Sequence, residues 1–308
     1  MQIYETDLLR IDKVGHPGGE AYLARTSERT LLFDSGFAYS APALVEELEE
    51  LLGERALDSI FLSHSHYDHA SGSVWVKERW PGAVICGSAH AAHVLERPGA
   101  RDTILALNYE ATKTALEFGR ISDEQANAVD YAPLAKLAID EIVDDGSIID
   151  MGSITFEVIA APGHTRCSLM LWCPDERLLF GSESLGLMLS DDIVGLCCLT
   201  GYYDCLATIA RAQSLEPEHI VTSHREVVSG AQATRYLENA HRWAEKIAHL
   251  VWESHAKGMD KDQIAAEIEE LFFTQTERKS YQPKAAFDLN TKILIDLLLA
   301  TKNEPLSQ

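Results

Sequence analysis

A short segment near the N-terminal end of the chain, SHSHYDHASG at 63–72, is rich in side chains that bind divalent metal ions: His64, His66, Asp68 and His69. Imidazole suits zinc, iron, nickel and copper, and a neighbouring carboxylate widens the choice toward manganese and iron. Residues two apart on extended backbone point to the same side, so His64, His66 and Asp68 can converge while His69 turns off where the strand ends. Chance histidines in a surface loop are the alternative. Four ligand types within six positions favour a metal site.

Three further donors, His164, Glu183 and His224, each follow a short apolar segment. His164 lies in a Pro-Gly turn, where it would otherwise be an ordinary loop residue. If each apolar segment is a strand, its end can present one donor to the same edge of a sheet. Seven donors are too many for one tetrahedral ion, so the sequence predicts a site for two ions, with one carboxylate able to bridge them.

The elements that would position these donors are strands and amphipathic helices in two successive halves. Period-two patterns and turn residues predict strands at 21–26, 30–33, 60–62, 83–86, 147–149, 154–160, 168–172, 177–180 and 220–222. Helical spacing predicts helices at 40–52, 73–79 and 89–96. A helical insertion is expected at 98–138, with Ser122 and Gln125 forming a capping box, and more helices follow residue 229.

Composition limits the classes of partner. The chain has 308 residues, with 48 Asp plus Glu against 26 Lys plus Arg. Such a charge repels phosphate backbones and anionic membranes, and no basic run offsets it, so neither nucleic acid nor a membrane is an expected partner. The six cysteines form no CxxC pair and are expected to be reduced. The start has no signal-like leader, and a cytoplasmic location is expected.

The order of the donors also resembles a known family. HxHxDH, then a histidine in PGHT, an acidic residue and a final histidine resemble the metallo-β-lactamase superfamily from about Ala21 to His224. The resemblance implies an α/β fold, a four-layer αββα sandwich with the metals at one edge. It assigns the first ion to His64, His66 and His164, and the second ion to Asp68, His69 and His224. It also makes Asp34 a residue that supports ligand orientation.

The layout outside the motif resembles the quinolone-response thioesterase PqsE and its relatives. On that resemblance, residues 1–228 form the metallo-β-lactamase-like domain, with the insertion at 98–138. Residues 229–308 form a helical extension that covers the active site. An apolar helix in this extension could equally serve a homodimer.

Several residues depart from the family pattern. In GSESLG, Glu183 stands where the family usually has aspartate. Its extra methylene leaves three arrangements open: a wider metal pair, a single ion, or a carboxylate turned away. SHRE at 223–226 replaces a GHG-like sequence and suggests that Arg225 meets an anionic group of the substrate. Tyr109 and Trp243 are candidates for the pocket wall, with packing in the core as the alternative.

The mechanism implied by the resemblance is metal-assisted hydrolysis by a bridging hydroxide at two divalent ions, zinc or iron, with manganese possible. Asp68 would orient the nucleophile and move its proton, and Glu183 would bridge the ions. A small thioester, ester or lactone fits a helix-covered pocket. Two alternatives remain: a regulatory or ligand-binding protein with a vestigial metal site, and a metallo-nuclease.

Overall fold

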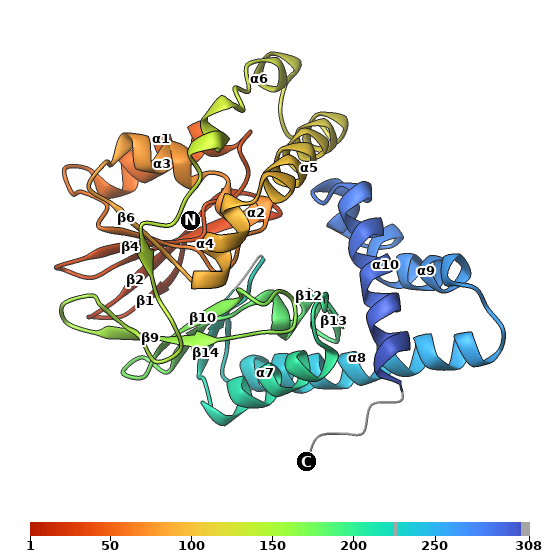
Figure 1. Ribbon diagram of the computed structural model, residues 1–308. Coiled ribbons are helices and arrows are strands. Elements are labelled where there is room, and N and C mark those ends of the chain that lie inside the picture. The colour runs from red at the N-terminus through yellow and green to blue at the C-terminus, as the bar shows by residue number, and fades with distance from the viewer. Residues whose placement is uncertain (225–226, 303–308) are drawn as a thin grey trace.

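Two mixed β-sheets form the centre of the computed structural model, which describes residues 1–224 and 227–302 (Figure 1). The first sheet has the strand order β1 (Gln2–Glu5), β2 (Arg10–His16), β3 (Gly19–Arg25), β4 (Thr30–Phe33), β5 (Ser59–Phe61), β6 (Val84–Gly87) and β7 (Glu141–Ile142). The second has the order β15 (Val227–Ser229), β14 (His219–Val221), β11 (Leu178–Phe180), β10 (Leu169–Cys173), β9 (Thr155–Ala160) and β8 (Ile148–Asp150). A small hairpin, β12 (Leu187–Ser190) and β13 (Ile193–Gly195), stands apart.

Helices cover the outer face of each sheet (Figure 1). The first sheet carries α1 (Ala41–Leu52) and α3 (Ser73–Arg79), and the second carries α7 (Tyr202–Ser214) and α8 (Ala231–Ala256). The remaining helices are α2 (Tyr67–Ala70), α4 (Ala89–Glu96), α5 (Pro98–Glu117), α6 (Asp123–Asn127), α9 (Lys261–Glu269) and α10 (Lys284–Thr301). None of these described helices combines the length and apolarity that a membrane span requires.

Alternation of side chains along the strands explains the layers. On β4, Leu32 packs toward α1 and α3, while Leu31 and Phe33 face the second sheet. On β11, Phe180 joins the cluster between the sheets, whereas Leu179 packs toward α7 and α8. Buried apolar residues therefore form three clusters, one at each interface of a four-layer stack. The predicted αββα sandwich is confirmed.

Parallel strand pairs bring the chemically important loops to one edge. In the first sheet, Phe33 of β4 is opposite Phe61 of β5, so the segments that follow both strands start at the same level. In the second sheet, Phe180 of β11 is opposite Val221 of β14 in the same way. The carboxyl ends of parallel strands meet at one edge, which places the donor segments of both sheets together.

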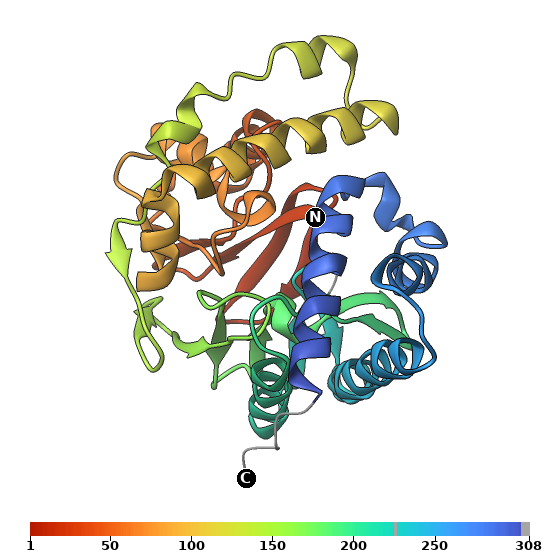
Figure 2. The ribbon, with the colours of Figure 1, turned by 45° about the vertical axis from the view of Figure 1, so that its right-hand side comes forward.

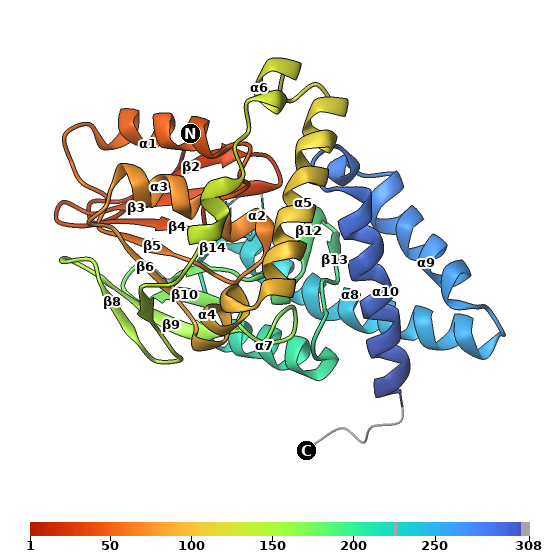
Figure 3. The same ribbon diagram turned by 45° about the horizontal axis from the view of Figure 1, so that its top comes forward.

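The insertion and the C-terminal helices meet beside this edge. Figures 2 and 3 show α10 standing next to α5, and α10 also contacts α8 and α9. The expected capping box of Ser122 with Gln125 is present at α6, and a second capping box, formed by Asp260 with Gln263, begins α9. The strand β15 crosses the boundary that the sequence predicted at residue 228.

We expect the apolar packing between the two sheets to contribute more to the free energy of unfolding than any other part of the core. Phe180 is fully buried, and its ring centroid lies 4.9 Å from that of Phe33. We expect Phe180→Ala to lower the free energy of unfolding by about 3–5 kcal/mol, because it leaves a cavity between the sheets. Urea unfolding measures this loss. The control Ile148→Ala, at a residue that is 61% exposed, should change stability by less than about 0.5 kcal/mol. Equal losses would contradict the assigned core.

Candidate metal centre

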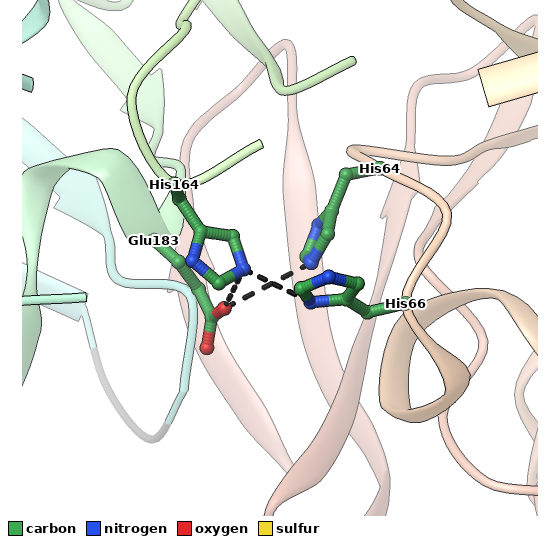
Figure 4. A group of neighbouring side chains, drawn as sticks. All are labelled: His64, His66, His164 and Glu183. Carbon is green, nitrogen blue, oxygen red and sulfur yellow. Dashed lines mark hydrogen bonds and ion pairs between the residues drawn. The ribbon is translucent and has the colours of Figure 1, made fainter. Parts of the chain in front are cut away.

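The first group of donors consists of His64, His66, His164 and Glu183, whose ligand atoms all lie within 4.8 Å of one another. Figure 4 shows the three imidazole rings and the carboxylate pointing toward one centre. His164 Nε2 lies 3.0 Å from His66 Nδ1 and 2.5 Å from Glu183 Oε2, and His64 Nε2 lies 3.8 Å from the same oxygen. The histidines come from the segment after β5 and from the turn between β9 and β10.

The second group consists of Asp68, His69, Glu183 and His224, again within 4.8 Å. His224 Nε2 lies 2.8 Å from Glu183 Oε1, and His69 Nε2 lies 4.0 Å from the same oxygen and 3.9 Å from Asp68 Oδ2. Asp68 and His69 are on α2, the short helix that begins directly after His66. Thus the structure brings all seven predicted donors together.

Glu183 belongs to both groups through different atoms. Its Oε2 faces His64 and His164, and its Oε1 faces His69 and His224. Two ligand atoms on one tetrahedral zinc ion lie about 3.3 Å apart, given bonds of about 2.0–2.1 Å, and the distances within each group bracket that value. The longer side chain does not turn its carboxylate away from the donors. Of the three arrangements left open by the sequence, the one with the carboxylate turned away does not match this geometry.

The donor atoms themselves fit bound cations. His64 Nε2, His69 Nε2 and Asp68 Oδ1 are buried, and the described residues offer none of them a hydrogen-bond partner. Buried polar atoms without partners are rare in folded proteins, because each loses its hydrogen bonds to water. Three such atoms in one cluster are explained if they coordinate metal ions. Divalent ions with nitrogen and oxygen ligands satisfy this donor set.

Carboxylates behind the histidines hold two of the rings. Asp34 lies at the end of β4 in the left-handed region, with φ 58°. Its Oδ2 lies 2.8 Å from His69 Nδ1 and accepts from Ser63 Oγ, while its Oδ1 accepts from the Ser63 amide. This contact leaves His69 Nε2 directed at the cluster. Asp34 therefore occupies the supporting place that the family resemblance implied.

Glu20 is a supporting carboxylate that the sequence did not reveal. It lies on β3, is buried, and accepts from the Gly18 amide through Oε2, the atom that lies 3.4 Å from His224 Nδ1. The only signal in the sequence was an acidic residue at the start of an apolar strand. The backbone carbonyl of Cys197 plays the same part for His164, 2.9 Å from its Nδ1.

The turn that carries His164 depends on glycine. Gly163 has φ 126°, and a Cβ there would lie 2.4 Å from Cys205 Sγ and 2.6 Å from its amide nitrogen. A side chain would thus collide with the first turn of α7. The close approach places His164 against the second sheet, with its amide donating to Ser184 Oγ.

Burial and neighbouring charges divide the histidines into two kinds. Burial, aided by the nearby His164, lowers the pKa of His66 to about 3, and burial with three neighbouring rings lowers that of His64 well below its ordinary value. For His164 and His224, burial also acts to lower the pKa. Neighbouring groups, Cys197 and Glu183 for His164 and Glu183 and Glu20 for His224, outweigh it and raise the pKa well above the ordinary value.

Two cavities adjoin the cluster. The larger one, of about 620 Å³, is bounded by the ligand residues, by α4 and α5, and by α10. Its apolar wall comes from Val94, Ala100, Ile104, Leu107, Leu199, Ala286, Leu289 and Ile293. The smaller one, of about 20 Å³, reaches the ligands from the side of residues 278–282. The C-terminal extension therefore bounds the site through α10 and the turn before it.

The three residues suggested for substrate contact have different surroundings. Trp243 is buried in the helical core, where its Nε1 donates to the carbonyl of Asp192, and it is not part of either cavity wall. Tyr109 is 47% exposed, packs its ring on Tyr131 and borders a separate cavity. Aromatic character alone therefore did not identify the wall. Arg225 lies outside the described residues.

Comparisons with known proteins agree with this geometry. A family model described as "Metallo-beta-lactamase superfamily" matches residues 15–182. The chain is 25% identical over 220 residues to the protein called "Probable metallo-hydrolase YflN" of Bacillus subtilis, covering 65% of this chain and 76% of that protein.

Solved structures share the fold. A β-lactamase domain protein from Burkholderia ambifaria matches with a TM-score of 0.62 and 14% identity, covering 97% of this chain and 88% of that one. A metallo-β-lactamase family protein from Thermus thermophilus matches with a TM-score of 0.59 and 17% identity, covering 95% and 93%. Both matches span nearly the whole chain, so the fold they share includes most of the C-terminal helices.

The raised pKa values predict that metal binding releases protons. The raised pKa values of His69, His164 and His224 favour their protonated forms in the absence of metal, and a metal ion must displace those protons. We expect zinc added to chelator-treated protein to release roughly two to three protons per chain and to bind more tightly as pH rises from 6 to 8. Calorimetry in buffers of different ionisation enthalpy counts these protons. Binding without proton release would contradict the charge states assigned to the three rings.

Proposed function

Because the chain belongs to the metallo-β-lactamase superfamily, we propose that it is a metal-dependent hydrolase that cleaves a thioester, ester or lactone bond of a small molecule. The observation that carries the proposal is the carboxylate of Glu183 shared between two groups of donors at the wall of a large cavity. We propose two divalent ions, zinc or iron, as the cofactors. Bound there, they would supply Lewis-acid polarisation and lower the pKa of water toward neutrality.

Asp68 is the residue that we propose for proton transfer. It lines both cavities, and its Oδ1 has no hydrogen-bond partner among the described residues. Burial raises the pKa of its carboxyl group, and the nearby His69 offsets part of this rise. A carboxylate with a raised pKa is a better proton acceptor. Asp68 takes the proton of the attacking water and passes it to the leaving thiolate or alkoxide.

The shape of the larger cavity supports a small acyl substrate. Its wall of aliphatic side chains from α5 and α10 suits an alkyl or aryl group, because the transfer of apolar surface out of water is favourable. Arg97 and Arg166, both exposed, lie where the cavity meets solvent. The enclosure by two helices is a poor fit for a polymer that must pass through the site.

A substrate panel tests the proposal directly. Metal-replete protein is assayed with octanoyl-N-acetylcysteamine, p-nitrophenyl octanoate, γ-octalactone and bis-p-nitrophenyl phosphate. We expect turnover of at least one of the three acyl compounds. Turnover of the phosphodiester alone would contradict the proposal and favour a nuclease. No turnover of any compound, together with tight binding of a small ligand, would favour a regulatory protein.

Asp68→Asn tests the role of its carboxylate. We expect kcat on the best acyl substrate to fall by about 10²–10⁴-fold, because the amide cannot accept the proton. The control Asp102→Asn makes the same chemical change at an exposed residue of α5 without a partner among the described residues, and should leave kcat unchanged. Metal analysis of both variants separates lost proton transfer from lost metal. Full activity in Asp68→Asn would remove it from the mechanism.

A further inference from the structure

The smaller cavity is a recess at the side of the larger one. The two share four lining residues, Tyr67, Asp68, Glu183 and Gln282, so they meet at the metal ligands. A volume of about 20 Å³ holds one water-sized group. A substrate that fills the larger cavity can place a single oxygen atom in this recess.

Arg278, from the C-terminal extension, lines the recess together with Asp68, Glu183 and His224. The residue is only 5% exposed, but its guanidinium nitrogens keep contact with solvent, and no hydrogen bond or ion pair joins them to a described residue. Its one described neighbour of note is the Phe287 ring, whose centroid lies 5.4 Å from Cζ. A guanidinium group that lines a recess without an anionic partner among the described residues is free to pair with an anion that enters the recess.

The backbone around Arg278 is held in place by the helical insertion. Arg278 is the second residue of a 3₁₀ turn, Glu277–Ser280, and its amide donates to the Thr276 hydroxyl. Arg120, which follows α5, donates from Nε to the Ser280 carbonyl at 2.9 Å and from a terminal nitrogen to its hydroxyl at 2.7 Å. The two segments that were added to the sandwich thus meet and fix the turn that carries the cation.

Two further polar groups border the recess. Gln282 Oε1 is buried without a partner among the described residues, and the same side chain carries an amide donor. Tyr67 lines both cavities, and its phenol is a neutral hydrogen-bond donor. Apart from the metal-ligand candidates, the recess therefore combines one cation with neutral polar groups.

The charge balance of the centre indicates which state of the protein needs this cation. Asp34, Asp68, Glu20 and Glu183 carry four negative charges when ionised, and two divalent ions would carry four positive charges. The loaded centre is then neutral, and Arg278 remains uncompensated. A negative charge that arrives or develops during the reaction can pair with it.

We propose that Arg278 is a catalytic residue that binds the oxygen of the scissile carbonyl as it becomes an oxyanion, and afterwards binds the same oxygen in the carboxylate product. This role rests on the proposed acyl hydrolysis. Water attacks the carbonyl carbon, the π-bond electrons move to the oxygen, and Asp68 accepts the water's proton. When the carbonyl re-forms, the bond to sulfur or oxygen breaks, and the leaving group takes that proton. The carboxylic acid formed then loses the remaining proton of the attacking water to solvent and becomes the carboxylate. The charge at the recess rises as the water attacks, which is when Arg278 contributes most.

The test compares Arg278→Gln and Arg278→Lys with Arg235→Gln. Arg235 is an exposed arginine of α8 without a partner among the described residues, and its variant serves as the control. In Arg278→Gln we expect kcat to fall about 10²-fold with little change in KM, because the lost interaction forms mainly in the transition state. Arg278→Lys keeps the charge without the planar fork and should recover part of that loss.

A binding measurement makes the test independent of turnover. Octanoate, the product of the octanoyl substrates, is titrated calorimetrically into the metal-loaded protein, with octanamide as the neutral match. We expect Arg278→Gln to weaken octanoate binding about tenfold, to leave octanamide binding unchanged, and to differ from Arg235→Gln, which should match the wild type. Because the octanoate carboxylate can also bind the metal ions, the readout is the difference in octanoate affinity between Arg278→Gln and Arg235→Gln.

The outcomes separate this inference from the proposed function. If no acyl compound is hydrolysed but octanoate binding still depends on Arg278, the anion site stands and acyl hydrolysis fails. If acyl compounds are hydrolysed and neither kcat nor octanoate affinity changes in Arg278→Gln, the anion site is wrong and hydrolysis stands. A rise in KM alone would assign Arg278 to a remote anionic group of the substrate and overturn the oxyanion role. A lower melting temperature with unchanged kinetics would make Arg278 structural.

Discussion

The contact between one buried carboxylate and two sets of imidazoles is the interaction on which the site depends. Glu183 has its Oε2 beside His164 and its Oε1 beside His224, and these two histidines come from different connections of the second sheet. The first sheet supplies the remaining donors from the segment after β5. The two sheets must therefore keep a fixed separation, and the aromatic cluster of Phe33, Phe156 and Phe180 between them maintains it.

A cluster of buried ionisable groups is tolerated because its members compensate each other. Burial alone would raise the pKa of Glu183, but His164 and His224 lower it well below its ordinary value. Asp34 fixes the ring of His69 from behind, and Glu20 places a carboxylate oxygen 3.4 Å from His224 Nδ1. This arrangement keeps three donor atoms inside the protein without hydrogen-bond partners among residues 1–224 and 227–302, a state that hydrophobic packing alone would not stabilise.

Local patterns in the sequence were sufficient for the motif and for most elements, because strand alternation, helix caps and ligand spacing depend on near neighbours. The Ser122 to Gln125 capping box is an example. The first two strands and α7 were missed, since their short or mixed patterns carry a weak signal. The direction of the Glu183 carboxylate required the positions of both sheets, which no local pattern contains.

Contacts between residues far apart in the sequence could not be predicted for the same reason. Glu20 pairs with His224 and Arg278 reaches the Asp68 recess only in the folded protein. Trp243 illustrates the reverse case, because an aromatic residue on an apolar helix face is more often core than pocket wall.

The claim that Glu183 joins two metal positions is tested most directly by anomalous diffraction from crystals of the metal-replete protein. The account predicts two anomalous peaks per chain, one among His64, His66 and His164 and one among Asp68, His69 and His224, with one oxygen of Glu183 directed at each peak. A single peak, or a Glu183 side chain turned out of the cluster, would contradict it.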